Sequence, residues 1–197
     1  IGDDTAGKVV RLRAFLFYGP GDKADVFMPV VYGLPSFVEC ATYEWPGHGL
    51  RDNEPFAENL DELAKDAFEA IKPALEEVKE GAEFEGAPFA FIGRSVGCQL
   101  LTAVAKAVLT QYGMVPCAVV MADRAPLQFP LLSADGQEAL KSDPARVVKA
   151  FNFDKSGMVD TRTWSNDLRY ASETRDPFFH KFECPMLVLK GKEDASV

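Results

Sequence analysis

The 197-residue sequence has only two histidines and four cysteines, and no two cysteines form a C-x-x-C pair. No apolar run reaches the roughly 20 residues that a membrane-spanning helix needs, so we expect no membrane span. No cluster of His, Cys and Asp has the spacing of metal ligands, so we expect the protein to need no metal and no bound cofactor. Scattered single cysteines are typical of reduced core thiols and indicate the cytoplasm or another reducing compartment, such as an organelle stroma. They are Cys40, Cys98, Cys117 and Cys184.

The charge balance is acidic, with 21 Lys and Arg against 30 Asp and Glu, a formal net charge of −9. Because no Lys/Arg cluster offsets this charge, a nucleic-acid partner is not expected. The hydrophobic content of 47% and the charged content of 26% are those of a globular protein, and the length fits a single domain over residues 1–197. The sequence begins with neither Met nor a signal-peptide pattern, which predicts that the natural N-terminus lies upstream.

What the sequence does contain is an apolar run over residues 89–92 that leads into Gly93-Arg94-Ser95-Val96-Gly97. A helical pattern follows at once, with apolar residues at three- and four-residue spacing. A G-x-S-x-G pattern between a strand and a helix is typical of a nucleophile elbow, whose tight turn requires small residues on both sides of the serine. Ser95 is therefore the candidate nucleophile, and an ordinary glycine-rich turn is the alternative.

The remaining pattern alternates strands and helices, which predicts a mainly parallel sheet with helices on both faces. Strands are expected over residues 9–18, 37–45, 89–92, 116–122 and 186–189. The last two are continuous apolar runs of the kind found in buried parallel strands. A long amphipathic helix begins near Leu60, and Pro73 is expected to kink or restart it. Residues 127–181 show short helical patterns and no convincing strand, which predicts a helical lid inserted over the site.

Four stretches together carry a family resemblance: the glycine-rich turn that ends in Val26-Phe27, residues 44–51 (EWPGHGLR), the elbow, and residues 123–126 (DRAP). On these stretches the chain resembles the α/β-hydrolase superfamily, and within it the type II thioesterases of polyketide and nonribosomal peptide synthases. Residues 167–170 and 184–189 also look like that family's lid end and acid-bearing strand. The resemblance extends from Phe15 to Asp194 and implies an α/β-hydrolase fold with a helical lid.

The resemblance also implies catalytic roles. Ser95 would be the nucleophile, and the backbone N–H of Val96 would be one oxyanion donor. Asp194, which follows the strand 186–189, would be the acid of the triad, unless it is a plain turn residue. Asp123 is the fallback acid, because some related domains place the acid there, or it only pairs with Arg124.

The sequence departs from the family in the turn that should supply the second oxyanion donor. Pro20 occupies the expected donor position, and proline has no N–H. Either Gly19 or Gly21 would therefore have to donate in its place. Arg94 stands where the family commonly has a histidine before the nucleophile, a change expected to be tolerated.

The catalytic base is the missing part. The triad of this fold runs Ser, Asp, His along the chain, whereas His48 and His180 both precede Asp194. Neither is favoured as the base, since His48 lies in a turn where the family has a structural residue and His180 lies between lid and strand. We therefore expect the chain to be truncated at its C-terminus, before the last strand and the histidine loop.

The sequence thus favours a serine thioesterase that hydrolyses acyl thioesters on an acyl carrier protein or a CoA-type pantetheine, through an acyl-Ser95 intermediate. Two alternatives stay open: a carboxylic-ester hydrolase of the same fold, and a non-catalytic scaffold or binding subunit, which Pro20 and the missing histidine motivate. Apolar lid residues would line the acyl pocket above Ser95. They are Phe129, Phe151, Phe153, Trp164 and Phe178.

Overall fold

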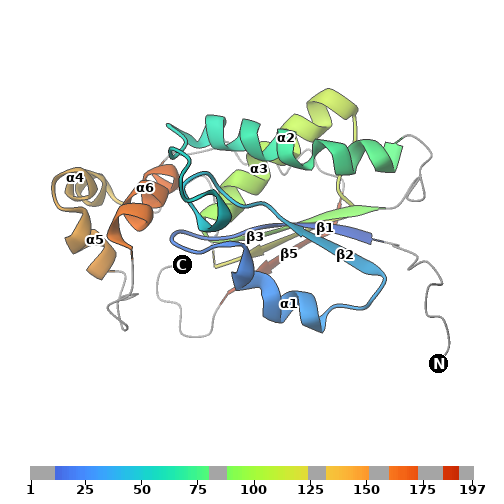
Figure 1. The fold of residues 1–197 in the computed structure, drawn as a ribbon, viewed down its shortest axis with the longest axis horizontal. Coiled ribbons are helices and arrows are strands. Elements are labelled where there is room, and N and C mark those ends of the chain that lie inside the picture. The colour runs from blue at the N-terminus through green and yellow to red at the C-terminus, as the bar shows by residue number, and fades with distance from the viewer. Residues whose placement is uncertain (1–11, 80–87, 124–131, 151–159, 173–183, 191–197) are drawn as a thin grey trace.

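The computed structural model describes residues 12–79, 88–123, 132–150, 160–172 and 184–190 (Figure 1). Its centre is a five-stranded sheet in the order β2-β1-β3-β4-β5, and every neighbouring pair is parallel. The strands are β1 (Leu12–Phe17), β2 (Val38–Thr42), β3 (Phe89–Arg94), β4 (Ala118–Ala122) and β5 (Met186–Leu189). The predicted parallel α/β architecture is therefore confirmed.

Helices cover both faces of this sheet. The long helices α2 (Leu60–Lys79) and α3 (Val96–Tyr112) lie along one face, and α1 (Met28–Gly33) lies on the other (Figure 1). Two short 3₁₀ turns, η1 (Ala24–Phe27) and η2 (Gly49–Arg51), lie in the loops that follow β1 and β2. Parallel strands need such crossovers, because consecutive strands must start from the same edge of the sheet.

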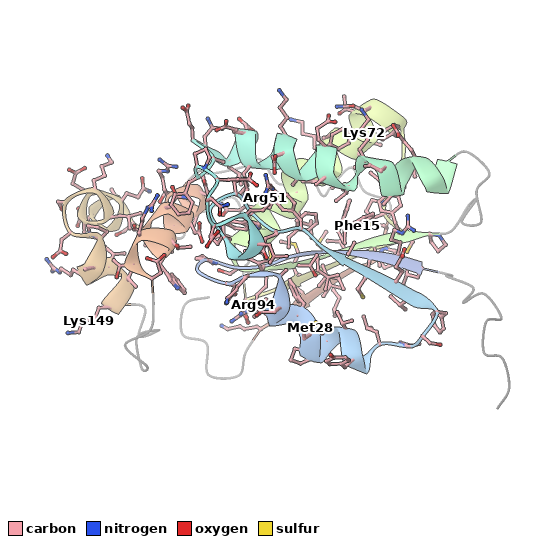
Figure 2. The ribbon with its side chains drawn as sticks, viewed as in Figure 1. Phe15, Met28, Arg51, Lys72, Arg94 and Lys149 are labelled. Carbon is pink, nitrogen blue, oxygen red and sulfur yellow. The ribbon has the colours of Figure 1, made fainter. Side chains whose placement is uncertain are left out.

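The core between the sheet and the two long helices is rich in aromatic rings. Phe15, Phe89 and Phe91 are buried and have ring centroids 5.4–6.4 Å apart in tilted and edge-on arrangements. Figure 2 shows Phe15 between the strands and α2. Each such pair adds about 0.5–1.5 kcal/mol beyond the burial of its apolar area. These contacts join β1 to β3, the strand that leads into Ser95.

Helix α2 continues through Pro73 as one element instead of restarting there. Pro73 is exposed. The backbone carbonyl that loses its hydrogen-bond partner at a proline can bind water on such a face, which lowers the cost of keeping the helix intact.

Two expectations about burial are wrong. Strand β5 forms as predicted, but its four residues are 41–53% exposed, because β5 is the edge strand among the described elements. All four cysteines are free thiols, as expected, but only Cys98 is buried and Cys117 is exposed. Both errors have one cause. The local sequence predicts a strand or an apolar side chain, whereas the exposed fraction of that residue depends on which other elements cover it.

The described parts of the predicted lid are helical, as expected. They form α4 (Ala134–Ser142), α5 (Pro144–Ala150) and α6 (Thr161–Ala171), which lie beyond one end of the sheet (Figure 1). Helix α6 packs against α3, and a small core of its own ties it to the other two lid helices. That core contains Leu132, Val147, Val148 and Leu168. Across the described residues, no helix is both long and apolar enough to span a bilayer.

Candidate active site

Ser95 lies in the turn between β3 and α3, with a backbone φ of 51° and ψ of −122°. A side chain at such angles costs about 1–3 kcal/mol and persists only where surrounding contacts enforce it. Here the backbone N–H of Ser95 donates to the carbonyl of Ala122 on β4 at 2.8 Å, which fixes the turn to the neighbouring strand. The Ser95 side chain makes no capping hydrogen bond to α3, so its hydroxyl is not used to start the helix.

Gly97 is required by its contact with β1. A Cβ at this position would lie 2.1 Å from the carbonyl oxygen of Phe17 and 2.4 Å from that of Tyr18. Real Cβ atoms do not approach backbone oxygens so closely, so the first turn of α3 can pack on β1 only with glycine here. The sequence-based requirement for glycine after the serine is confirmed at this position.

Substituting Gly97→Ala is therefore expected to destabilise the protein by about 3 kcal/mol, at the upper end of the usual cost of overpacking, because the obstructing atoms belong to backbone. Urea unfolding measures the loss. Gly33→Ala is the matched control, since a Cβ there meets no atom within 4 Å. Equal stability of the two variants would contradict the tight packing of the elbow on β1.

Two of the three candidate oxyanion donors adjoin Ser95. Val96 is the first residue of α3, so its backbone N–H has no acceptor within the helix. A Cβ on Gly19 would lie 3.1 Å from the Cβ of Ser95, which places the turn after β1 directly beside the nucleophile. The Gly21 N–H, in contrast, donates to the carboxylate of Asp167 at 2.8 Å and is directed to the lid instead of Ser95.

Asp167 and His48 form a buried pair at this turn. The Nε2 atom of His48 lies 2.9 Å from the Oδ2 atom of Asp167, and the two side chains are 2% and 0% exposed. The Nδ1 atom of His48 lies 3.0 Å from the carbonyl oxygen of Pro46, which can only accept a hydrogen bond. With both ring nitrogens engaged in this way, His48 is not placed to take a proton from Ser95.

The surroundings of this pair favour a protonated His48 imidazole beside the Asp167 carboxyl group. Burial raises the pKa of the Asp167 carboxyl, although His48 and the Gly21 N–H act in the opposite direction. Burial alone would lower the pKa of His48, but the hydrogen bond and charge of Asp167 outweigh it and hold that pKa above its ordinary value. Because Asp167 and Pro46 both present acceptors, a doubly protonated imidazole beside an ionised carboxylate satisfies both ring nitrogens of His48.

Arg94, next to the nucleophile, bridges two carboxylates. Its guanidinium lies 3.0 Å from Asp22 in the β1 turn and 3.3 Å from Asp123 after β4. Figure 2 shows Arg94 near the end of the sheet that faces the lid helices. Burial raises the pKa of Asp22, while Arg94 and the Gly19 amide lower it to a smaller extent.

The bridge changes the interpretation of Asp123. Arg94 is a basic partner of this carboxylate, and Arg124, the partner considered from the sequence, lies outside the described residues. Asp123 has a positive φ of 57°, and its backbone N–H donates to Leu189 on β5 at 3.0 Å. The bridge thus gives Asp123 a structural role beside Ser95, and its role as fallback acid stays a prediction.

Several predicted site residues lie outside the described residues. They are the predicted acid Asp194, the second histidine His180, and the lining candidates Phe129, Phe151, Phe153 and Phe178. Trp164 is described, and its indole packs against Gly21, where a Cβ would lie 1.9 Å from the Trp164 Nε1 atom. Trp164 therefore lies at the catalytic edge, and its contact with substrate stays a prediction.

A cavity of about 580 Å³ lies among the lid helices. Its walls include Phe56, Leu140, and the α6 residues Arg162, Ser165 and Arg169. These α6 residues are spaced three and four apart and occupy the face opposite to Trp164 and Asp167. Ser95 is not among the lining residues, so this cavity is not the apolar pocket predicted above the nucleophile. Within the described part of the chain, no group of three or more His, Cys, Asp or Glu side chains could hold a metal.

The geometry agrees with what comparison with known proteins finds. A family model described as "Thioesterase domain" matches residues 15–173, which include the end of β1, the strands β2 to β4, the elbow and the lid helices α4, α5 and α6. The chain belongs to the thioesterase domain family. Among curated proteins, it is 24% identical over 195 residues to the AMB antimetabolite synthetase AmbE of Pseudomonas aeruginosa. That match covers 95% of this chain but only 9% of the relative's length.

Solved structures of thioesterases share the fold. The RedJ thioesterase from the prodiginine pathway of Streptomyces coelicolor matches with a TM-score of 0.70 and 19% identity, over 91% of this chain and 66% of that one. BorB, a type II thioesterase from the borrelidin biosynthetic cluster, matches with a TM-score of 0.71 and 20% identity, over 94% and 75%. This thioesterase domain therefore has the α/β-hydrolase fold of type II thioesterases.

Sequence reasoning did not assign a role to Asp167 or Asp22. Asp167 begins the stretch Asp167-Leu168-Arg169-Tyr170, which resembles the family's lid end, but no local signal indicates a buried carboxylate. The available signal was an acidic residue on the apolar face of an amphipathic helix, because a charge there requires a partner. His48 was not favoured as the base, and its partner Asp167 is 119 residues away in the sequence.

Proposed function

We propose that this thioesterase domain hydrolyses acyl thioesters on a carrier-protein pantetheine arm or on a CoA-type thiol, through an acyl-Ser95 intermediate. The observation that carries the proposal is the strained elbow. Ser95 is held at φ 51° at the start of α3, with Val96 and Gly19 beside it, in a chain of the thioesterase family. The carrier-protein substrate is supported by the type II thioesterases among its structural relatives.

The proposed chemistry uses two steps at one carbonyl carbon. The Ser95 hydroxyl loses its proton to a base and attacks the thioester, and the thiol leaves with a proton to give acyl-Ser95. Water then attacks the ester, releasing a carboxylic acid and restoring the hydroxyl. The N–H group of Val96 would stabilise the negative oxygen that develops in each step, and the Gly19 N–H, which in this structure is directed to the Asp22 carboxylate, would be the second donor once it turns to the substrate. The base would be a histidine outside the described residues, oriented by Asp194 or Asp123.

A serine-directed fluorophosphonate tests the nucleophile directly. The full-length protein should be labelled at Ser95, located by peptide mass spectrometry, and Ser95→Ala should remove the label. Labelling of the full-length protein that persists in Ser95→Ala would refute the assignment.

The same protein distinguishes the rival functions. Incubated with an acyl carrier protein, an acyl-CoA and a simple carboxylic ester, it should release free acid from the thioesters at a much higher kcat/KM. A preference for the ester would favour the esterase alternative. The absence of both labelling and turnover would favour a non-catalytic scaffold.

A further inference from the structure

We propose that Asp167 is a positioning residue for the thioesterase reaction: from lid helix α6, it holds the β1 turn (residues 18–22) in place beside Ser95. This inference rests on the function proposed above and adds a residue to it. Asp167 touches neither Ser95 nor the atoms that would react. It would act through the backbone of the turn that carries the second oxyanion donor.

The contacts of Asp167 join three segments at one oxygen atom. Its Oδ2 atom accepts hydrogen bonds from the Gly21 N–H at 2.8 Å and from His48 Nε2 at 2.9 Å. Gly21 belongs to the turn after β1, and His48 to the loop after β2. A fully buried carboxylate on α6 therefore fixes the lid to the ends of two adjacent strands.

The turn is also held by packing against the same helix. Gly21 has a φ of +72° and lies against the Trp164 indole, which leaves no space for any side chain. Trp164 and Asp167 are three residues apart on α6, so one face of this helix supplies both the packing contact and the hydrogen bond. Gly21 cannot shift without moving the lid helix.

The position of Gly21 determines the position of Gly19. The Asp22 N–H donates to the Gly19 carbonyl at 3.3 Å, which closes the turn around Pro20. Gly19 itself lies against Ser95, where an added Cβ would be only 3.1 Å from the serine Cβ. A displacement at Gly21 would therefore be transmitted to the group beside the nucleophile. Misplacement of about 1 Å in a catalytic site can reduce the rate about 100-fold.

Burial of the pair does not by itself explain its presence. A buried ion pair often adds little net stability compared with apolar side chains of similar size. The pair instead fixes the orientation of the turn, because an ionised carboxylate accepts hydrogen bonds from both the turn amide and the imidazolium. An apolar side chain cannot do this. The charge of Glu44 also raises the pKa of His48, and the charge of Asp167 raises the pKa of Asp22.

The test is a comparison of Asp167→Asn with Asp160→Asn in the full-length protein. Both change a carboxylate to the isosteric amide, but Asp160 is the N-cap of α6, and its carboxylate accepts from the Arg162 N–H and the Thr163 hydroxyl instead of the Gly21 N–H. We expect Asp167→Asn to lower kcat for acyl-thioester hydrolysis about 10- to 100-fold, with KM within about two-fold, because the loss falls on transition-state stabilisation. Asp160→Asn should leave both constants unchanged.

Other results overturn the proposal. A folded Asp167→Asn variant with unchanged kcat, or with a change only in KM, would show that Asp167 does not position the turn. Failure of the proposed function appears differently, as fluorophosphonate labelling of the wild type that is independent of Ser95. If Asp167→Asn does not fold, hydrogen exchange of the wild type decides: the Gly21 amide should be protected to the same extent as the β1 amides, and rapid exchange would refute the contact.

Discussion

Replacing Ser95 with alanine is expected to reduce thioester hydrolysis by a factor on the order of 10⁶, because loss of the nucleophile removes nearly all covalent catalysis. Ser95 lies between Gly19 and α3, and its side chain makes no capping hydrogen bond to that helix. The free energy of unfolding should therefore change little in Ser95→Ala. Single-turnover hydrolysis of an acyl carrier substrate, with the released acid quantified, gives the rate.

Glycine at the same position provides a sharper test of the strained elbow. The φ of 51° is unfavourable for alanine as well as serine, but not for glycine. Ser95→Gly should therefore be about 1 kcal/mol more stable than Ser95→Ala, after subtraction of the greater entropy that glycine loses on folding. Both variants should be equally inactive. Substantial hydrolysis by either would exclude Ser95 as the nucleophile, and greater stability of the alanine variant would contradict the strained backbone.

Breaking the buried pair is expected to have the largest effect on stability. His48→Gln removes the cation and leaves Asp167 buried without it, which typically costs about 3–5 kcal/mol. The double variant His48→Gln/Asp167→Asn should lose less than the sum of the two single variants, since it leaves no uncompensated charge. Urea unfolding of the four proteins gives the coupling free energy. Strict additivity would mean that the 2.9 Å contact contributes no coupling.

The same four proteins should reveal the pH dependence of the pair. The pKa of His48 is raised in the folded protein, so its contribution to stability is complete below the unfolded-state value of about 6.5 and is lost as the pH rises through the folded-state value. The raised pKa of Asp167 acts in the same direction. The stability advantage of the wild type over the double variant should therefore decrease from pH 6 to pH 9. An advantage that increases over this range would show that the pair does not retain its proton on folding.

Much of this molecule could be predicted from local sequence. The elbow follows from two glycines around a serine between an apolar run and a helical pattern, and a Cβ on Gly97 would lie only 2.1–2.6 Å from the backbone of Phe17 and Tyr18. Strand β5 was predicted with its observed ends, and the helical lid was recognised from its patterns. In each case the deciding interactions involve neighbours in sequence, or an apolar periodicity that one element carries alone.

Local sequence did not determine which residues are buried or which charged side chains pair with one another. The exposure of β5 and Cys117 depends on which elements cover the edge of the sheet. Arg94 pairs with Asp22, 72 residues away, because parallel strands bring the loops after β1, β3 and β4 to one edge. No local pattern encodes such a meeting.

The sequence by itself determined the candidate nucleophile, the glycines that shape its turn, and the parallel α/β fold, since those depend on backbone sterics and on the apolar pattern of single segments. Only the tertiary structure decided that the Gly21 amide faces the lid and that His48 pairs with Asp167. The physical reason is the cost of burial. A charged side chain enters the interior only where another segment supplies a partner, and that segment is identified only when the lid helix has packed on the strand ends.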